Sequence, residues 1–187
     1  MYFGKQRKLN RWQGYDYSMP RFYFVTICSQ KRICCFGDIV DNKMILNELG
    51  DIIKQQWLWL SQNYDYISLD EWQIMPNHIH GIIEIINKDY DSNGKIFTKP
   101  HKVGNVLERS LHNQGTPKIL PLYRVIGAFK TTSAKLINQE NGVYFKWQKS
   151  FHDRVIRSEQ ELNNIRYYIQ QNPINWQSDR NNPANIK

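Results

Sequence analysis

Two histidines separated by one residue, His78 and His80, have the type and spacing that could hold a metal ion. They stand in the isoleucine-rich run Met75-Pro-Asn-His-Ile-His-Gly-Ile-Ile-Glu-Ile, which predicts a strand. Alternate side chains of a strand project from the same face, so both imidazoles point to one side, with Cβ atoms about 7 Å apart. Two imidazoles placed in this way can bind one divalent ion and leave positions open for a substrate. A pair of half-buried histidines with purely structural hydrogen bonds is the alternative.

The helix predicted over residues 158–172 could supply a third ligand. Tyr168 and Asn172 are four residues apart, so their side chains stack on one side of this helix, whereas Tyr167 points nearly the opposite way, toward solvent. Tyr168 and Asn172 flank the apolar face and are placed to line the edge of a cleft, although an amphipathic surface tyrosine would show the same spacing. The residues that define the buried face recur at helical spacing and are Leu162, Ile165 and Ile169.

Strands and helices mix along the chain without a regular alternation, which favours an α+β fold with a mostly antiparallel sheet. Asn47 and Ser158 are the residues that we expect to cap the first and last helices. The predicted strands are 21–30, 40–46, 66–74 and 78–86, with short extended segments at 144–147 and 154–156, and the predicted helices are 47–62, 122–139 and 158–172.

The length of 187 residues predicts one domain over residues 1–187. Residues 87–121 are rich in Asn, Lys, Gly and Pro, and we expect a mobile insert there and a polar tail after residue 176. No apolar run approaches the roughly 20 residues of a membrane-spanning helix, and the basic N-terminus lacks the apolar stretch of a secretory signal. Three cysteines, two of them adjacent, do not indicate a disulfide framework, so we expect a cytoplasmic protein.

The net charge of +8 is unevenly spread. Residues 1–32 carry seven basic side chains and one acidic, residues 33–95 carry four and ten, and residues 123–157 carry seven and two. Basic clusters that alternate with aromatic residues favour a polyanion partner, because Lys and Arg displace counterions from phosphates and aromatic rings stack on bases. A strand with lysines on its outer face would give the same pattern. The candidate nucleic-acid-binding residues are Lys130, Lys135, Lys146, Trp147, Arg154 and Arg157.

Together these segments resemble the single-tyrosine transposases that carry a histidine-hydrophobe-histidine (HUH) motif. Pro76-Asn-His-Ile-His-Gly is similar to that motif, and Tyr168-Ile-Gln-Gln-Asn-Pro is similar to the tyrosine helix of the REP-associated branch of the family. The matching segments run in the expected order from about residue 21 to residue 176. The further matches are Tyr23-Phe-Val-Thr-Ile, Ile126-Gly-Ala-Phe-Lys-Thr and Trp147-Gln-Lys-Ser-Phe-His-Asp-Arg-Val-Ile-Arg.

The resemblance implies a ferredoxin-like (RRM-like) antiparallel sheet with helices packed on it. It implies cleavage and rejoining of single-stranded DNA, often beside a hairpin, through a 5′-phosphotyrosine on Tyr168. His78 and His80 would hold Mg²⁺ or Mn²⁺, with Asn172 as a polar third ligand. The insertion-sequence branch often has Gln four residues after its tyrosine, so Tyr167 with Gln171 is the alternative pair. Both a monomer and a homodimer are compatible with this resemblance.

Two other functions remain open at the level of sequence. A non-catalytic DNA- or RNA-binding domain on the same fold would depend neither on Tyr168 nor on a metal. In a cupin-like metalloenzyme, His78 and His80 followed by Glu84 would match the first metal-binding motif. The glycines expected around that motif are replaced by Trp72 and Asp91, and no second histidine motif follows. Three predicted helices also fit a β-barrel poorly.

Overall fold

The computed structural model describes residues 14–86, 88–90, 96–98, 119–140 and 144–185. Its centre is a four-stranded antiparallel sheet with the order β4-β5-β1-β8. The strands are β1 (Phe22–Cys28), β4 (Ile67–Met75), β5 (His78–Ile85) and β8 (His152–Val155), and the helices are α1 (Glu48–Asn63), α2 (Leu122–Glu140) and α3 (Glu159–Gln171). Because α1 connects β1 to β4 and α2 lies between β5 and β8, two βαβ units interleave in the ferredoxin-like arrangement. The predicted α+β fold is confirmed.

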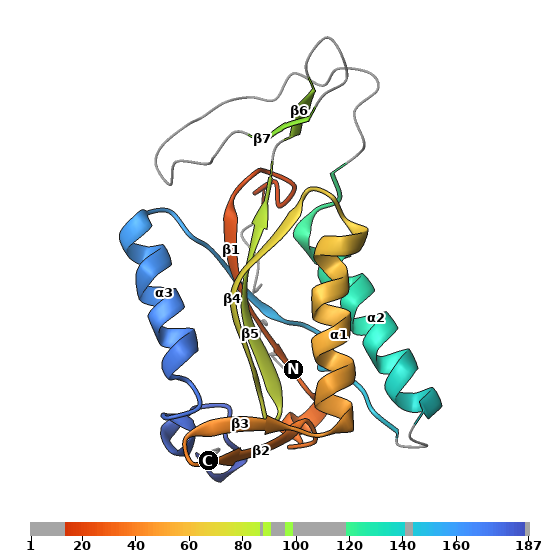
Figure 1. Cartoon of the computed structure of the whole chain (residues 1–187), viewed down its shortest axis with the longest axis vertical. Helices are drawn as coiled ribbons and strands as arrows, with labels where there is room; N and C mark the ends of the chain where they lie inside the picture. The colour runs from red at the N-terminus through yellow and green to blue at the C-terminus, as the bar shows by residue number, and fades with distance from the viewer. Residues whose placement is uncertain (1–13, 87, 91–95, 99–118, 141–143, 186–187) are drawn as a thin grey trace, which may run out of the picture.

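The three helices lie on two sides of the sheet (Figure 1). α1 and α2 cover one face and pack on each other, while α3 covers the other face and contacts β4 and β5. Asn47 caps α1 by accepting a hydrogen bond from the backbone N–H of Gly50, and Ser158 caps α3 by accepting one from Glu161. Both predicted caps are therefore present.

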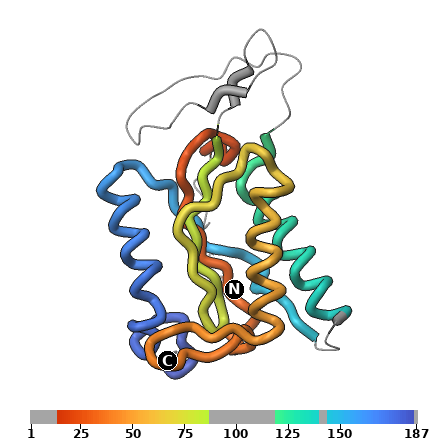
Figure 2. The backbone as a smooth tube through the Cα atoms, in the orientation of Figure 1, coloured from red at the N-terminus to blue at the C-terminus, as the bar shows by residue number. Residues whose placement is uncertain are grey.

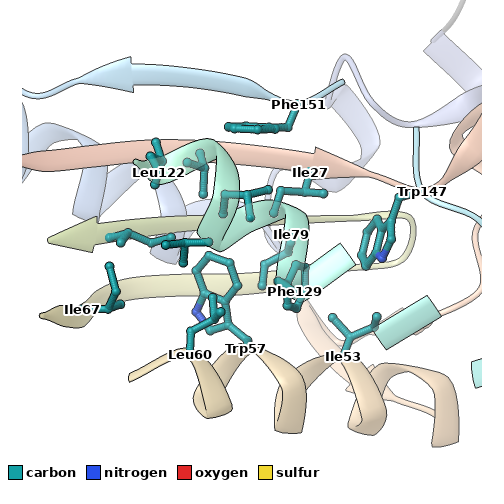
Figure 3. Close-up of a cluster of buried hydrophobic side chains, with 14 of the residues drawn as sticks. Ile27, Ile53, Trp57, Leu60, Ile67, Ile79, Leu122, Phe129, Trp147 and Phe151 are labelled. Atoms are coloured by element: carbon teal, nitrogen blue, oxygen red, sulfur yellow. The ribbon is translucent and has the colours of Figure 1, made fainter. Parts of the chain in front are cut away.

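The main hydrophobic core lies between the sheet and the pair of helices α1 and α2 (Figure 3). The strand period of two sends Ile79 and Ile83 of β5 into this core, on the face opposite the histidines. Gly81 lies on the same face, and a Cβ atom there would stand 2.4 Å from Cζ2 of Trp57. The glycine that follows His80 therefore lets α1 approach β5 closely.

Two short hairpins extend this arrangement. β2 (Gly37–Val40) pairs with β3 (Lys43–Leu46), and Asp41 and Asn42 between them have φ values of 48° and 62°, as in a type I′ turn. The strand predicted at 40–46 is therefore the second half of a hairpin. Within the predicted insert at 87–121, β6 (Lys88–Tyr90) pairs with β7 (Ile96–Thr98), and residues 87, 91–95 and 99–118 lie outside the described residues.

The segment after α3 is folded, whereas we expected a polar tail. It forms two 3₁₀ turns, η2 (Trp176–Ser178) and η3 (Pro183–Asn185), and lies at the same end of the molecule as the β2–β3 hairpin (Figure 2). Asn181 and Asn182 are only 3% and 7% exposed. Asparagine amides hold the segment: for example, Nδ2 of Asn182 donates to the carbonyl oxygen of Trp176 at 3.0 Å. A segment that is held by asparagine side chains shows no hydrophobic periodicity in its sequence, and for this reason the sequence predicted only a polar tail.

No helix in the described part of the chain is long and apolar enough to cross a membrane. All three cysteines are free thiols, with Cys28 buried and Cys34 exposed.

Candidate active site

His78 and His80 lie side by side on the face of β5 that is turned toward α3. Their ring centroids are 4.5 Å apart, and neither side chain is exposed to solvent. The prediction that both imidazoles project from one face is confirmed. Their complete burial also means that every ring nitrogen needs a partner, because an unsatisfied buried polar atom costs about 1–3 kcal/mol.

Asn77 determines which ring nitrogen of His78 carries a free lone pair. Its side-chain oxygen lies 2.7 Å from Nδ1 of His78, and its Nδ2 donates to the carbonyl oxygens of Arg32 and Asn181 at 2.9 and 2.8 Å. Because those two carbonyls fix the orientation of the amide, its oxygen faces the histidine and accepts the proton of Nδ1. Nε2 of His78 therefore carries a lone pair, and it is buried without a hydrogen-bond partner among the described residues.

His80 is held by residues from β1 and α3. Its Nδ1 lies 2.8 Å from Oγ1 of Thr26, and its ring stacks on Phe24 with centroids 5.4 Å apart. Its other nitrogen, Nε2, lies 3.3 Å from the hydroxyl of Tyr168. The sheet therefore orients one side of this imidazole, and the last helix brings a phenol to the other.

Both histidines are neutral near pH 7. Burial, together with the nearby guanidinium groups of Arg32 and Arg180, lowers the pKa of His78 to about 3. The pKa of His80 is also well below its ordinary value, because of burial first and then because of His78 and Arg180. Neutral imidazoles keep the lone pairs that metal coordination requires.

Asp179, which the sequence did not single out, completes a group of three possible ligands. One ligand atom from each of His78, His80 and Asp179 lies within 4.8 Å of the others. Oδ2 of Asp179 is 3.8 Å from Nε2 of His78, and the aspartate side chain is only 5% exposed. Because His78 is neutral, this contact brings a carboxylate against a lone pair, an arrangement that a bound cation would satisfy. No local signal marks this aspartate, since it reaches the site only through the fold of the C-terminal segment.

Asn172 is the C-cap residue of α3 and is 2% exposed. Its Nδ2 donates to the carbonyl oxygen of Tyr168 at 3.3 Å, while its Oδ1 is buried without a hydrogen-bond partner among the described residues. A buried oxygen without a hydrogen-bond partner is of the kind that can bind a metal ion. The two imidazoles and the carboxylate of Asp179 form a mixed nitrogen and oxygen donor set that fits Mn²⁺ or Mg²⁺.

The two adjacent tyrosines of α3 have different surroundings. The hydroxyl of Tyr168 approaches His80, and its ring meets Phe24 edge-on with centroids 6.1 Å apart. Tyr168 is 43% exposed, so solvent and a substrate can reach it, whereas Tyr167 is 65% exposed. The structure therefore brings Tyr168 and not Tyr167 to the histidine pair, as the helical spacing predicted.

Polar contacts at the edge strand anchor α3. The register of β4 against β5 shifts between Leu69 and Trp72, which marks a β-bulge. Asp70 in this bulge accepts two hydrogen bonds from Arg166, at 2.8 Å from Nε and 2.6 Å from Nη2. Gln170 also donates to Glu71 at 2.9 Å. These contacts hold the helix that carries Tyr168 against the sheet.

Three of the predicted nucleic-acid-binding residues lie away from the histidine pair. Trp147 is 7% exposed and packs in the main core, where its Nε1 donates to Ser133 at 2.9 Å, so its predicted role in base stacking is wrong. Phe145 and Phe151 are core residues too, which the alternating pattern did not distinguish. Lys130 and Lys135 belong to α2, on the opposite side of the sheet from α3 (Figure 1), and Nζ of Lys130 donates to the carbonyl oxygen of Gln148 at 2.6 Å.

The other three are on the surface or near α3. Lys146 is exposed, and its Nζ lies 4.6 Å from the ring centroid of Tyr144. Arg154 in β8 forms an ion pair with Glu161 at 2.6 Å, and the backbone N–H of Arg157 donates to the same carboxylate at 2.9 Å. Arg154 and Arg157 therefore stand beside the start of α3, where an acidic side chain offsets part of their charge.

The cupin-like alternative is wrong. Among the described residues, the histidines belong to a four-stranded sheet covered by helices, not to a β-barrel. Glu84 pairs with Phe22 and Ser68 in the register of the sheet, four positions along β5 from His80. It belongs to neither the metal-ligand group nor the contacts of Tyr168.

Comparison with known proteins shows first the fold of the chain and then its family. The solved structure of a REP-associated tyrosine transposase bound to a REP hairpin is similar, with a TM-score of 0.52 and 14% sequence identity, over 89% of this chain and 73% of that one. The chain has the fold of these tyrosine transposases. An uncharacterised protein of Haemophilus influenzae is 32% identical over 174 residues, 93% of this chain and 92% of the relative, and the chain belongs to its family. No protein-family model matches the sequence.

Proposed function

We propose that this protein is a metal-dependent transposase that cleaves and rejoins single-stranded DNA with Tyr168 as the nucleophile. The observation that carries the proposal is the 3.3 Å approach of the Tyr168 hydroxyl to Nε2 of His80, in a transposase fold. A half-exposed phenol beside two buried neutral imidazoles is an arrangement that a purely structural tyrosine does not require.

His78, His80 and Asn172 would hold Mg²⁺ or Mn²⁺, and Asp179 would join them as a fourth ligand. The unsatisfied Nε2 of His78 and Oδ1 of Asn172, both buried, support this assignment. When bound, such an ion supplies positive charge that stabilises the nonbridging oxygens of a phosphodiester in the transition state.

The residues of the chain have distinct tasks in this reaction. The phenol oxygen of Tyr168 attacks phosphorus, forming a phosphotyrosine bond at the 5′ side and releasing the 3′-oxygen as a hydroxyl. Phe24 and His80 hold the phenol by ring contacts with centroids 6.1 and 5.3 Å away. The covalent bond conserves the energy of the phosphodiester, so a second 3′-hydroxyl can attack it and rejoin the strand.

The test is covalent capture of DNA. A library of labelled single-stranded hairpin oligonucleotides with randomised flanks is incubated with protein and Mn²⁺, and adducts are separated on denaturing gels and sequenced. We expect an adduct with wild-type protein and Tyr167→Phe, and none with Tyr168→Phe or in EDTA. DNA binding without any adduct would instead support the non-catalytic binding domain. An adduct that persists in Tyr168→Phe and disappears in Tyr167→Phe would transfer the role to Tyr167.

A further inference from the structure

Two arginines from distant parts of the chain meet beside the histidine pair. Arg32 ends the short turn η1 (Gln30–Arg32) that follows β1, and Arg180 belongs to the segment after α3. Nη1 of Arg32 donates to the carbonyl oxygen of Arg180 at 3.4 Å. The amide of Asn77 donates to the carbonyls of Arg32 and Asn181, so the residue that orients His78 also joins the two arginine-bearing segments.

The charges of these arginines act on the histidines, and the carboxylate of Asp179 lies in the same region. Both guanidinium groups help to lower the pKa of His78, and Arg180 also acts on His80. Within the described part of the chain, neither guanidinium forms an ion pair with a carboxylate. Arg180 is exposed and Arg32 is partly exposed, so an external anion can reach both.

The backbone at Arg32 is unusual as well. Lys31 and Arg32 both have a φ of 56°, in the left-handed region that residues with a Cβ atom rarely adopt. Two such residues in succession are strained, because the Cβ atom crowds the backbone in this region. This turn brings the carbonyl oxygen of Arg32 to Asn77 and its guanidinium group to the C-terminal segment.

We propose that Arg32 and Arg180 form a phosphate-binding subsite for the backbone of a single-stranded nucleic acid, adjacent to the histidine pair. Guanidinium groups bind phosphate oxygens through parallel N–H donors, which suits a phosphodiester better than a small neutral ligand. The subsite rests on the proposed function, since it holds the strand that Tyr168 would cleave. Asn77 links the two arginine-bearing segments to His78, and Tyr168 contacts His80, so a strand bound at Tyr168 and at the arginine pair would pass the two histidines.

The test measures binding in EDTA, where no cleavage occurs. A fluorescein-labelled DNA hairpin with single-stranded flanks is titrated with wild-type protein, Arg32→Gln, Arg180→Gln and the double variant over a range of KCl concentrations. Each lost phosphate contact lowers the slope of log Kd against log salt by about 0.7, which is about a fivefold loss of affinity near 0.1 M KCl. We expect this change in each single variant and about twice this change in the double variant. Lys54→Gln, an exposed lysine of α1 on the other side of the sheet, is the matched control and should retain the wild-type slope.

A second measurement separates phosphate binding from a structural role of Arg32. Single methylphosphonate linkages, which remove one phosphate charge at a time, are placed along the flanks of the same hairpin. We expect a position that weakens binding of wild-type protein and has no effect on the double variant. Unchanged salt slopes in both single variants, or an equal fall in Lys54→Gln, would overturn the subsite. If Tyr168 forms its adduct while the slopes stay unchanged, the subsite fails and the proposed function stands.

Discussion

The hydroxyl of Tyr168 lies 3.3 Å from Nε2 of His80, although 88 positions separate the two residues along the chain. Neither residue could make this contact without the order of the sheet. β5 is a central strand, with β4 on one side and β1 on the other. The face of β5 that carries the histidines is the face that α3 covers. In the part of the chain that the structure describes, the side-chain hydrogen-bond partners of His80 are the hydroxyls of Thr26 and Tyr168.

The metal-ligand group should depend on Asp179. Asp179→Asn removes a buried carboxylate that faces Nε2 of His78 at 3.8 Å, and His78→Ala removes the imidazole itself. We expect each variant to weaken Mn²⁺ binding at least about tenfold, because Asp179→Asn removes the negative charge of the ligand set and His78→Ala removes one of its nitrogen ligands. The measurement is calorimetric titration of the protein with Mn²⁺. Asp38→Asn, an exposed residue of β2, is the control, and an equal loss there would argue against the assignment of Asp179.

The anchoring of α3 by Asp70 and Arg166 should be measurable as a coupling energy. Two hydrogen bonds join the partly buried side chains, at 2.8 and 2.6 Å. In a double-mutant cycle with Asp70→Asn and Arg166→Gln, urea unfolding should give a coupling of about 1 kcal/mol, since the pair is only partly shielded from solvent. Additive effects of the two substitutions would mean that the pair does not hold α3.

The same pair predicts a pH dependence of stability. Burial alone would raise the pKa of Asp70, but the hydrogen bonds from Arg166 and from the backbone N–H of Glu71 outweigh it and lower this pKa below its ordinary value. A carboxyl group with a depressed pKa in the folded state stabilises the fold above its unfolded pKa of about 4 and loses that contribution as the pH falls through the folded value. The free energy of unfolding should therefore fall less steeply below about pH 4 in Asp70→Asn than in wild-type protein. Parallel curves from the two proteins would contradict this expectation.

Gly81 should resist substitution for a steric reason. In Gly81→Ala the new Cβ would stand 2.4 Å from Cζ2 of Trp57, so the indole must move within a packed core, which costs about 1–3 kcal/mol. Gly127→Ala is the matched control, because among the described residues no atom beyond the adjacent backbone of α2 lies within 4 Å of that Cβ position, and alanine favours a helix by up to about 1 kcal/mol. Thermal unfolding should show a lower Tm for Gly81→Ala and an equal or higher Tm for Gly127→Ala. Equal shifts in both variants would show that the contact with Trp57 is not the cause.

Much of the site could be predicted because it depends on local periodicity. A strand places His78 and His80 on one face whatever surrounds it, and a helix places Tyr168 and Asn172 on one side. Trp147 was misassigned because an alternating aromatic and basic pattern suits a buried strand and a nucleic-acid surface equally well. Trp147 is buried because other segments of the main core pack around it, and its own segment of sequence does not show this.

By itself, the sequence determined the three helices, the caps of the first and last of them, and the direction of the side chains within the predicted elements, because these depend on residues a few positions apart. The tertiary structure alone decided which distant residues meet. Asp179 reaches His78 because asparagine amides fold back the segment after α3, and Arg32 approaches Arg180 through the carbonyls that Asn77 binds. Such contacts follow from the packing of segments up to 148 residues apart, and no spacing within the chain encodes them.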